Sequence, residues 1–175
     1  ARATALGATY TAGVTGTAVT GALSSGDVVL NGVTVGASSS DGVSFVGASG
    51  SSKAVAAAIN SASVPYITAV ANTTSVAAGA APTASTNLID NDLIINGTDI
   101  GAVTGAGTAV LQGAAIATAI NAKSAATGVS ATSSGTTGVV TLSAIDGRNI
   151  TVTATANGLT GTGFANATTT TRGTI

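Results

Sequence analysis

The amino-acid sequence predicts an α+β protein, in which antiparallel β-hairpins and sheets are each packed by one short alanine-rich helix, in two tandem units. Three features support this prediction. Two Asn-Gly pairs each lie between runs of aliphatic residues, an alanine-rich stretch poor in glycine follows each pair, and segments of aliphatic residues alternating with Thr or Ser come after. Hairpin, helix and strands in this order are typical of an α+β fold with antiparallel sheets.

The two units are predicted from an internal duplication. Residues 27–36 align with residues 92–101 at an offset of 65, with Asp, Asn and both Gly identical. Residues 54–60 align with residues 115–121 at an offset of 61, ending in Ile-Asn in both copies. Two blocks that recur in the same order indicate a repeated structural unit rather than alanine-rich composition alone.

This duplication divides the chain into four expected regions. We expect a truncated first unit at 27–86 and a complete second unit at 87–160. An N-terminal strand region at 1–26 precedes them, and a linker or strand at 161–175 follows. Residues 77–86, which include Pro82, are expected to connect the two units.

Each Asn-Gly pair predicts a two-residue hairpin turn, because a type I′ turn needs positive φ at both central residues. With Asn96-Gly97 as the turn, Ile95 faces Thr98 and Leu93 faces Ile100. Three aliphatic side chains then share one face, whereas Ile94 and Asp99 point to the other. The first copy has the same pattern around Asn31-Gly32, with an apolar face made by Val28, Leu30, Val33 and Val35.

One helix is predicted in each unit, over residues 52–61 and 111–123, where alanine is abundant and apolar residues recur at helical spacing. Ser51 or Ser52, and Thr108, are the expected N-caps. The apolar stripes are Val55, Ala58 and Ile59 in the first helix, and Ile116, Ala119 and Ile120 in the second. Asn60 and Asn121 fall where these stripes end, so we expect them to close the helices in the left-handed conformation.

Alternation of aliphatic residues with Thr or Ser predicts antiparallel strands at residues 128–132, 140–144 and 150–154. The first unit retains only a trace of this pattern, at residues 67–70. Residues 162–171 are expected to form an exposed linker or an edge strand.

Composition excludes several classes of function. Ala, Thr and Gly number 37, 31 and 24 among 175 residues, and the chain has no His, Cys, Met or Trp. Without His or Cys there is no Ser-His-Asp or Cys-His pair, no common zinc site and no disulfide. Five basic residues against six acidic ones cannot form the clustered basic face that nucleic acid needs. We therefore expect no enzyme, no cofactor, no metal and no nucleic-acid partner.

The remaining candidate sites have simpler interpretations. Asp146-Gly147-Arg148-Asn149 offers a single carboxylate, too few oxygen ligands for calcium, so a turn between strands is expected. A glycosidase pair drawn from Asp27, Asp92 or Asp99 is left open by the sequence, although nothing singles out two of them. We expect no catalytic, cofactor-binding or metal-binding residues.

The chain is expected to be a fragment of a longer protein, since Ala1-Arg2-Ala3-Thr4 lacks an initiator Met and the layout of a signal peptide. No stretch approaches the ~18 uninterrupted apolar residues of a membrane helix, so no membrane partner is expected.

These motifs resemble the flagellin "IN" motif, which is named for the pair found here as Ile95-Asn96. In that family the motif runs from hairpin to an alanine-rich helix ending in Ala-Ile-Asn, and then to strands. The second unit matches over about 60 residues. The first unit has Leu30-Asn31 in place of Ile-Asn. The matching segments of the second unit are 94–101, 119–122, 127–129 and 142–150, and the tail 171–175 resembles the strand that follows in many long flagellins.

The resemblance implies a variable outer domain, exposed on the bacterial flagellar filament outside the cell. Its role in motility would be that of a structural, non-catalytic part of the filament. Its partners would be neighbouring flagellin subunits, and O-glycans on exposed Ser or Thr would be expected. The helical ends that polymerise flagellin, on both sides of such a domain, are missing from these residues, so the fragment alone is expected to be monomeric. Export of flagellar subunits in unfolded form fits a chain of small residues without cysteine.

Two alternatives remain open. A hook-associated or filament-cap protein can carry the same motif and would be distinguished by its flanking sequence. A glycan-binding adhesin or phage-fibre domain shares this composition, but it would need an aromatic platform for sugars. The four aromatic residues, Tyr10, Phe45, Tyr66 and Phe164, are scattered along the chain.

Overall fold

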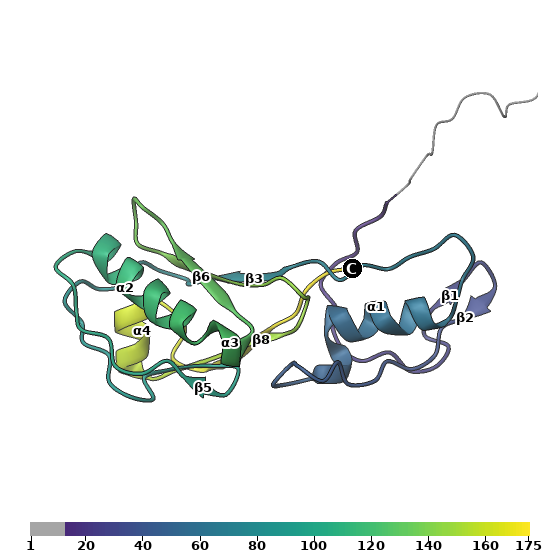
Figure 1. Ribbon diagram of the computed structural model, residues 1–175, viewed down its shortest axis with the longest axis horizontal. Coiled ribbons are helices and arrows are strands. Elements are labelled where there is room, and N and C mark those ends of the chain that lie inside the picture. The colour runs from purple at the N-terminus through teal and green to yellow at the C-terminus, as the bar shows by residue number, and fades with distance from the viewer. Residues whose placement is uncertain (1–12) are drawn as a thin grey trace, which may run out of the picture.

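The structure of the protein is a computed structural model that describes residues 13–175. Within these residues it contains four α-helices and nine β-strands, and the strands form three antiparallel sheets, which confirms the α+β class. Figure 1 shows two lobes side by side. The small lobe (residues 27–64) and the large lobe (residues 74–171) each contain one of the predicted hairpins.

The small lobe consists of one hairpin and one main helix. Its elements are β1 (Val29–Leu30), β2 (Val33–Thr34), the 3-10 helix η2 (Ala48–Gly50) and α1 (Ser52–Ser61). The predicted apolar face of the hairpin turns inward, with Val35 fully buried, whereas Val29 on the other face is exposed. The buried hydrophobic side chains of this lobe are small: Val35, Ala54, Val55, Ala56, Ala58 and Val64.

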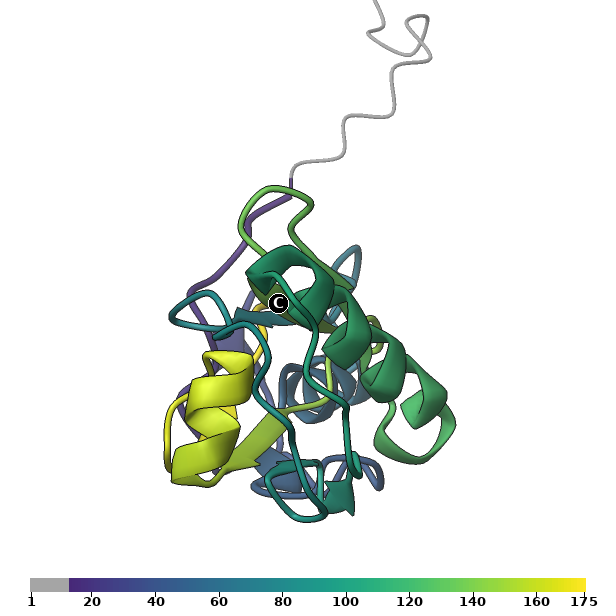
Figure 2. The same ribbon diagram turned by 90° about the vertical axis from the view of Figure 1, so that its left-hand side faces the viewer.

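The large lobe contains two sheets in contact with each other. The first has the order β3-β7-β6 and the second β5-β4-β8-β9. Figure 2 looks at the end of this lobe and shows α2 and α4 outside the strands. The bounds of the sheet elements are β3 (Thr74–Ala77), β4 (Leu93–Ile95), β5 (Thr98–Asp99), β6 (Ser130–Ser133), β7 (Val140–Ala144), β8 (Ile150–Ala154) and β9 (Thr168–Thr171).

The helices of the large lobe are α2 (Ala109–Ala122), α3 (Ser124–Thr127) and α4 (Ala156–Thr162). Helix α2 packs on β6 and β7, and α4 packs against α2 and β8. They enclose a core of larger aliphatic side chains, to which Phe164 adds an aromatic ring. The fully buried members with the largest side chains are Leu88, Leu93, Ile95, Ile116, Ile120, Leu142 and Ile150.

Both predicted hairpins are confirmed. Asn31 and Gly32 have φ of 49° and 80°, and Asn96 and Gly97 have φ of 47° and 77°, as type I′ turns require. Ile95 pairs with Thr98, and the Ile100 amide donates to the Leu93 carbonyl at 2.9 Å. The three aliphatic residues of this face are at most 4% exposed.

The helix in each unit is confirmed with its cap. Helix α1 has the predicted bounds, and the Ser51 side chain accepts from the Ala54 amide. Helix α2 starts two residues earlier than predicted and ends one residue earlier, and Thr108 caps it by accepting from the Leu111 amide. Serine and threonine take this position because their hydroxyl oxygens satisfy an amide that has no partner inside the helix.

The role predicted for Asn60 and Asn121 is wrong. Both lie inside their helices, and Ser63 takes the left-handed conformation after α1, with φ of 51°. Asn60 Nδ2 donates to the Ala69 carbonyl at 2.9 Å, and its Oδ1 accepts from the Ala69 amide at 2.8 Å. Asn121 makes the same two bonds to Ala131, at 2.9 and 2.8 Å. A carboxamide offers a donor and an acceptor together, so it pairs with the following extended segment as a peptide group would.

The strands predicted at 140–144 and 150–154 are confirmed as β7 and β8. The first strand after α2 is shifted, because Gly128 (φ 68°) ends α3 and β6 begins at Ser130. Residues 67–70 form no strand. The strand that follows α1 is β3 instead, and it pairs with β7 of the large lobe, with Thr74 opposite Ala144.

The C-terminal part of the chain combines a helix with an edge strand. Sequence reasoning missed α4, whose glycines at 158 and 161 argue against a helix. Packing requires Gly158, because a Cβ there would lie 2.0 Å from the Asp92 carbonyl oxygen, and it favours Gly161, where a Cβ would lie 2.5 Å from the Leu88 side chain and displace it. The edge strand expected within 162–171 is confirmed as β9, which pairs with β8.

The expected N-terminal strand region at 1–26 lies partly outside the described residues, which begin at Gly13. Residues 13–26 form no regular strand. They run beside the C-terminal residues, and the Gly16 and Val19 amides donate to the Ile175 and Gly173 carbonyls at 2.9 Å. The C-terminus therefore lies between the two lobes, next to the segment that leads to the N-terminus (Figure 1).

Candidate functional site

Residues 146–149 lie where the two lobes meet and form a polar junction between them. The sequence predicted this segment as a tight turn between strands, and it does connect β7 to β8. Its side chains and main chain also bond to the small lobe, more than 90 positions away in sequence. Within residues 13–175, no three His, Cys, Asp or Glu residues come together in a way that could hold a metal ion.

Asp146 and Gly147 bind the start of α1. Asp146 Oδ2 lies 3.0 Å from Lys53 Nζ and 3.0 Å from Arg148 Nη2. The Gly147 carbonyl accepts from Ser52 Oγ at 2.8 Å and from the Lys53 amide at 3.3 Å.

The Asp146 carboxyl group is held in its charged form by these contacts. Burial acts to raise its pKa, but hydrogen bonds from Arg148 and Lys53 and the positive charge of Arg148 outweigh burial and lower the pKa to about 2. The side chain is 28% exposed, so solvent screens part of this interaction. The ion pair between Lys53 and Asp146 therefore joins the lobes at neutral pH, and not at strongly acidic pH.

Asn149 is fully buried and enters the loop that precedes η2. Its amide donates to Ser44 Oγ at 2.9 Å, and its Nδ2 donates to the carbonyls of Val46 and Gly47, both at 3.0 Å. Glycine is favoured at position 47, because its φ is 63° and a Cβ would lie 3.1 Å from Arg172 Nη2, which would have to shift. The large lobe thus supplies the donor to the Val46 carbonyl and a second donor to the Gly47 carbonyl, which also accepts from the Gly50 amide at 2.8 Å.

Asp41 organises the receiving loop from within the small lobe. Its Oδ2 accepts from Ser44 Oγ and Ser51 Oγ, both at 2.6 Å, and its Oδ1 accepts from the Val43 and Ser44 amides. Burial acts to raise the pKa of Asp41, but these bonds outweigh it and the pKa lies below its ordinary value. One carboxylate therefore positions Ser44 for Asn149, and Ser51 for the cap of α1.

The three carboxylates left open as a glycosidase pair are each occupied by hydrogen bonds, Asp27 and Asp99 with nearby backbone amides and Asp92 also with the start of α4. Asp92 is buried, where it accepts from Thr155 Oγ1 at 2.6 Å, from the Ile89 amide at 2.9 Å and from Asn157 Nδ2. Burial acts to raise the pKa of Asp92, but these bonds lower it overall. Asp27 accepts from the Ser24 amide, and Asp99 accepts from the Asn91 and Gly101 amides.

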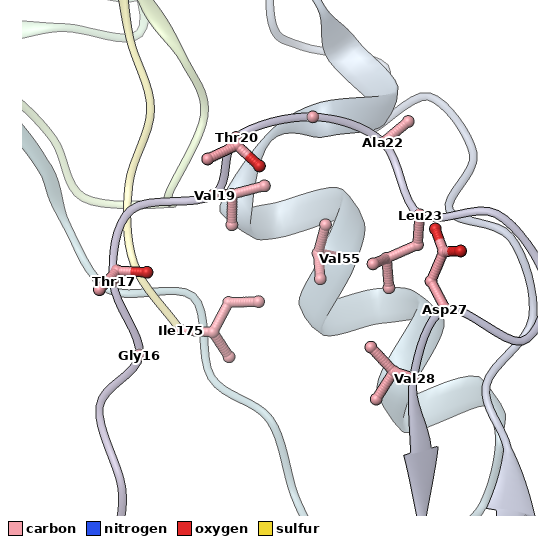
Figure 3. Close-up of a pocket in the computed structure, with 11 residues that line it drawn as sticks. Gly16, Thr17, Val19, Thr20, Ala22, Leu23, Asp27, Val28, Val55 and Ile175 are labelled. Carbon is pink, nitrogen blue, oxygen red and sulfur yellow. The ribbon is translucent and has the colours of Figure 1, made fainter.

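An apolar hollow of about 510 Å³ lies beside α1, between the N-terminal segment and the C-terminus. Figure 3 shows Val55 of α1 facing Leu23, Val28 and Ile175 across it. Among residues 13–175, Asp27 is the one residue with a titratable side chain that lines the hollow, and it accepts from the Ser24 amide at 2.7 Å. In the described part of the chain, the hollow thus offers mainly apolar surface and no nucleophile paired with a base.

The aromatic residues do not form a shared platform in the described part of the chain. Phe164 is buried in the core, and the Phe45 ring packs against the Asn96-Gly97 turn. Tyr66 is fully exposed. Phe45 precedes α1 and Tyr66 follows it, and a helix of that length spans about 15 Å. Tyr10 lies outside the described residues.

The junction is the feature that sequence reasoning missed. A polar residue such as Asn149 beside a strand is usually taken for part of an exposed turn, and nothing in its neighbours indicates burial.

No family model and no curated protein matches the chain. Among the described residues, no helix is long and apolar enough to cross a membrane.

Proposed function

We propose that this chain is a structural, non-catalytic outer domain of a bacterial flagellin, exposed on the surface of the filament outside the cell. The observation that carries the proposal is the position of its two ends. Residues 16–19 and 173–175 run side by side and are joined by two hydrogen bonds. A flagellin outer domain has polymerising segments on both sides, so its chain must leave the filament core and return to it at one place.

The polar junction supports the same role. Two lobes joined by an ion pair and by a buried asparagine form one body, which suits a surface element exposed to flow. Neighbouring flagellin subunits would be its partners in the filament, whereas residues 13–175 alone would be monomeric. Light scattering of the purified domain tests the second statement, and a stable oligomer would contradict it.

The location of the protein can be tested directly with antibodies raised against residues 13–175. Immunogold labelling of cells of the source organism should decorate flagellar filaments along their whole length. Labelling confined to the junction of hook and filament would indicate a hook-associated protein, and labelling of the tip would indicate a cap protein. Filaments without label at any position would reject a flagellar role.

O-linked glycans on exposed hydroxyls belong to the same proposal. Thr136, Thr168 and Thr169 are examples of exposed threonines. The intact mass of protein from its native source should exceed the mass of the sequence by whole sugar units. A mass equal to that of the bare sequence would reject this part of the proposal.

A glycan-binding adhesin or phage-fibre domain is the second candidate, and exposed Tyr66 is the observation that favours it, because sugar rings stack on aromatic faces. Tyr66 has φ of 62°, which is strained for a bulky side chain. A glycan array probed with the protein and with Tyr66→Ala decides the question. Binding that disappears in the variant would support this candidate, and an array without binding would reject it.

A further inference from the structure

The sequence contains three Asn-Gly pairs, at 31–32, 96–97 and 157–158. An Asn-Gly pair is chemically labile, because glycine has no side chain to shield its backbone nitrogen from the preceding carboxamide carbon. The dipeptide alone gives the same expectation for all three pairs. Their surroundings in the structure differ, and only the first pair is left free to react.

Asn31 lies at the tip of the small-lobe hairpin and is exposed. Within residues 13–175, no hydrogen bond joins its side chain to another residue. A Cβ added to Gly32 would meet no atom within 4 Å, so the space around the reacting nitrogen is open. The hairpin consists of two-residue strands in a two-stranded sheet, which opens at low cost in free energy.

Asn96 has nearly the same backbone conformation but a fixed side chain. Its Nδ2 donates to the Thr127 carbonyl at 2.8 Å, and its Oδ1 accepts from the Thr151 amide at 2.8 Å. Its own amide donates to the Thr151 carbonyl at 2.9 Å. The Phe45 ring covers Gly97, since a Cβ there would lie 2.5 Å from that ring. Rotation of this carboxamide toward Gly97 would break two hydrogen bonds.

Asn157 is fixed in a different way, in the first turn of α4. Its Nδ2 donates to the Asn87 carbonyl at 2.9 Å and to Asp92. The attacking nitrogen is also occupied, because the Gly158 amide donates to Thr155 Oγ1 at 3.0 Å as part of the helix cap. Gly158 is buried, so solvent base does not reach its amide.

We propose that Asn31 is a site of spontaneous deamidation and isoaspartate formation, and that the fold protects Asn96 and Asn157. The Gly32 backbone nitrogen loses its proton to solvent base and forms a bond to Asn31 Cγ. The side-chain nitrogen leaves as ammonia, which closes a five-membered succinimide. Water then adds to either carbonyl carbon and opens the ring to aspartate or isoaspartate. Nothing is oxidised or reduced, and water is the only co-reactant.

The modification changes the small lobe in two ways. It moves the formal net charge of the chain from −1 to −2. Isoaspartate also inserts a methylene group into the main chain, and a type I′ turn cannot accommodate it. The pairing of Leu30 with Val33 across the turn is therefore lost in the isoaspartyl form. Because the reaction is spontaneous, the fraction of molecules modified at Asn31 increases with the age of the protein.

Peptide mapping of the folded protein tests this proposal, and the chain supplies its own controls. Trypsin cleaves after Lys and Arg, so Asn31 falls in peptide 3–53, Asn96 in 54–123 and Asn157 in 149–172. Asn31 is the sole asparagine of its peptide. The protein is incubated at mildly alkaline pH and body temperature, and fragmentation mass spectrometry follows the gain of about one dalton at each asparagine.

We expect Asn31 to deamidate at least tenfold faster than Asn96 and Asn157 in the folded protein. In urea the three rates should agree within a few-fold, which would assign the difference to the fold. The Asn31→Ser variant should show no mass gain in peptide 3–53. Equal rates in the folded protein, or a folded-state order that urea leaves unchanged, would overturn the proposal.

Discussion

The two copies of the repeated unit share a hairpin, a capped helix and an asparagine that bonds the helix to the segment after it (Asn60 or Asn121). They differ in the strands that pair with the hairpin. In the large lobe, the hairpin strand β4 also pairs with β8, and β9 extends that sheet to four strands. In the small lobe, β1 and β2 pair only with each other. The same local sequence thus gives the same local structure. The hairpin of the large lobe is held by two further strands, and the hairpin of the small lobe is held by none in the described residues.

The difference has a direct cause in the strand that follows the first helix. In the second copy, the strand after the helix, β6, pairs with β7 of its own unit. In the first copy, β3 pairs with β7 as well, on its other edge. The strand that follows α1 therefore belongs to a sheet of the large lobe. The small lobe lacks this strand, and the hydrogen bonds from residues 146–149 help to hold it in place.

The largest expected effect is the loss of stability when a buried side chain is truncated, and it should differ between the cores of the two lobes. Leu142 is fully buried in the large lobe, so Leu142→Ala should lower the free energy of unfolding by about 3 kcal/mol. Val55 is 5% exposed in the small lobe, and Val55→Ala should cost about 1.5 kcal/mol because fewer apolar atoms are lost. Urea unfolding of both variants provides the measurement.

Ile145→Ala is the matched control, since Ile145 is 82% exposed and its removal should change stability by less than about 0.5 kcal/mol. A larger loss from Val55→Ala than from Leu142→Ala would show that the small lobe carries more of the stability than its small buried side chains indicate.

The second effect concerns the dependence of the small lobe on the junction. Asn149→Ala removes a fully buried side chain and with it the donor to the Val46 carbonyl and one of the two donors to the Gly47 carbonyl, at a cost of about 2 kcal/mol. Hydrogen exchange in residues 44–61 should become faster, while exchange in β7 stays unchanged. Asn166→Ala, at an exposed position, should leave both segments as they are. Equal acceleration in both lobes would mean that the variant destabilises the whole protein instead.

The third effect is a loss of junction stability in acid. The folded-state pKa of Asp146, about 2, lies below its value of about 3.9 in the unfolded chain. A lowered pKa gives stability that is complete above the unfolded value and is lost as pH falls from about 4 to about 2. With allowance for solvent screening, this stability is about 1–2 kcal/mol at neutral pH.

Asp146→Asn tests the pH effect through urea unfolding at several pH values. The variant should be less stable than the parent at neutral pH, and the two should converge toward pH about 2. Asp27→Asn is the control, because Asp27 bonds only within its own turn and forms no ion pair in the described structure. Parallel curves for the parent and Asp146→Asn would contradict the assignment.

Local signals were sufficient for much of this fold. Asn-Gly turns, hydroxyl caps and alternating strands each act within a few residues, and the hairpins, α1, β7 and β8 were predicted from them. Helix α4 could not be, because its glycines serve contacts with Asp92 and Leu88 that are distant in sequence. The pairing of β3 with β7 is equally non-local.

The junction shows the same limit for the candidate site. Asp146-Gly147-Arg148-Asn149 was correctly predicted as a turn, but its partners Ser44 and Lys53 lie more than 90 residues away. Asn60 and Asn121 were recognised as special and given the wrong role. Their true partners, Ala69 and Ala131, become visible only once the following segment is placed in space.

The smallest expected effect comes from a position where the two copies differ by one residue. Gly128 lies three residues before Ala131, the partner of Asn121, and Tyr66 lies three residues before Ala69, the partner of Asn60. Their φ values are 68° and 62°. Only glycine adopts this conformation without strain, so Tyr66→Gly should stabilise the protein by about 0.5–1 kcal/mol in urea unfolding.

Tyr66→Ala separates backbone strain from the loss of the ring. Alanine keeps the strained φ, and Tyr66 is fully exposed, so this variant should match the parent within about 0.5 kcal/mol. In the second copy a side chain at Gly128 would adopt the same strained φ and would also displace the Arg148 guanidinium, since a Cβ there would lie 2.0 Å from it. If Tyr66→Gly proved destabilising, the exposed ring would be contributing to the fold, and the small lobe would be more than a weakened copy of the large one.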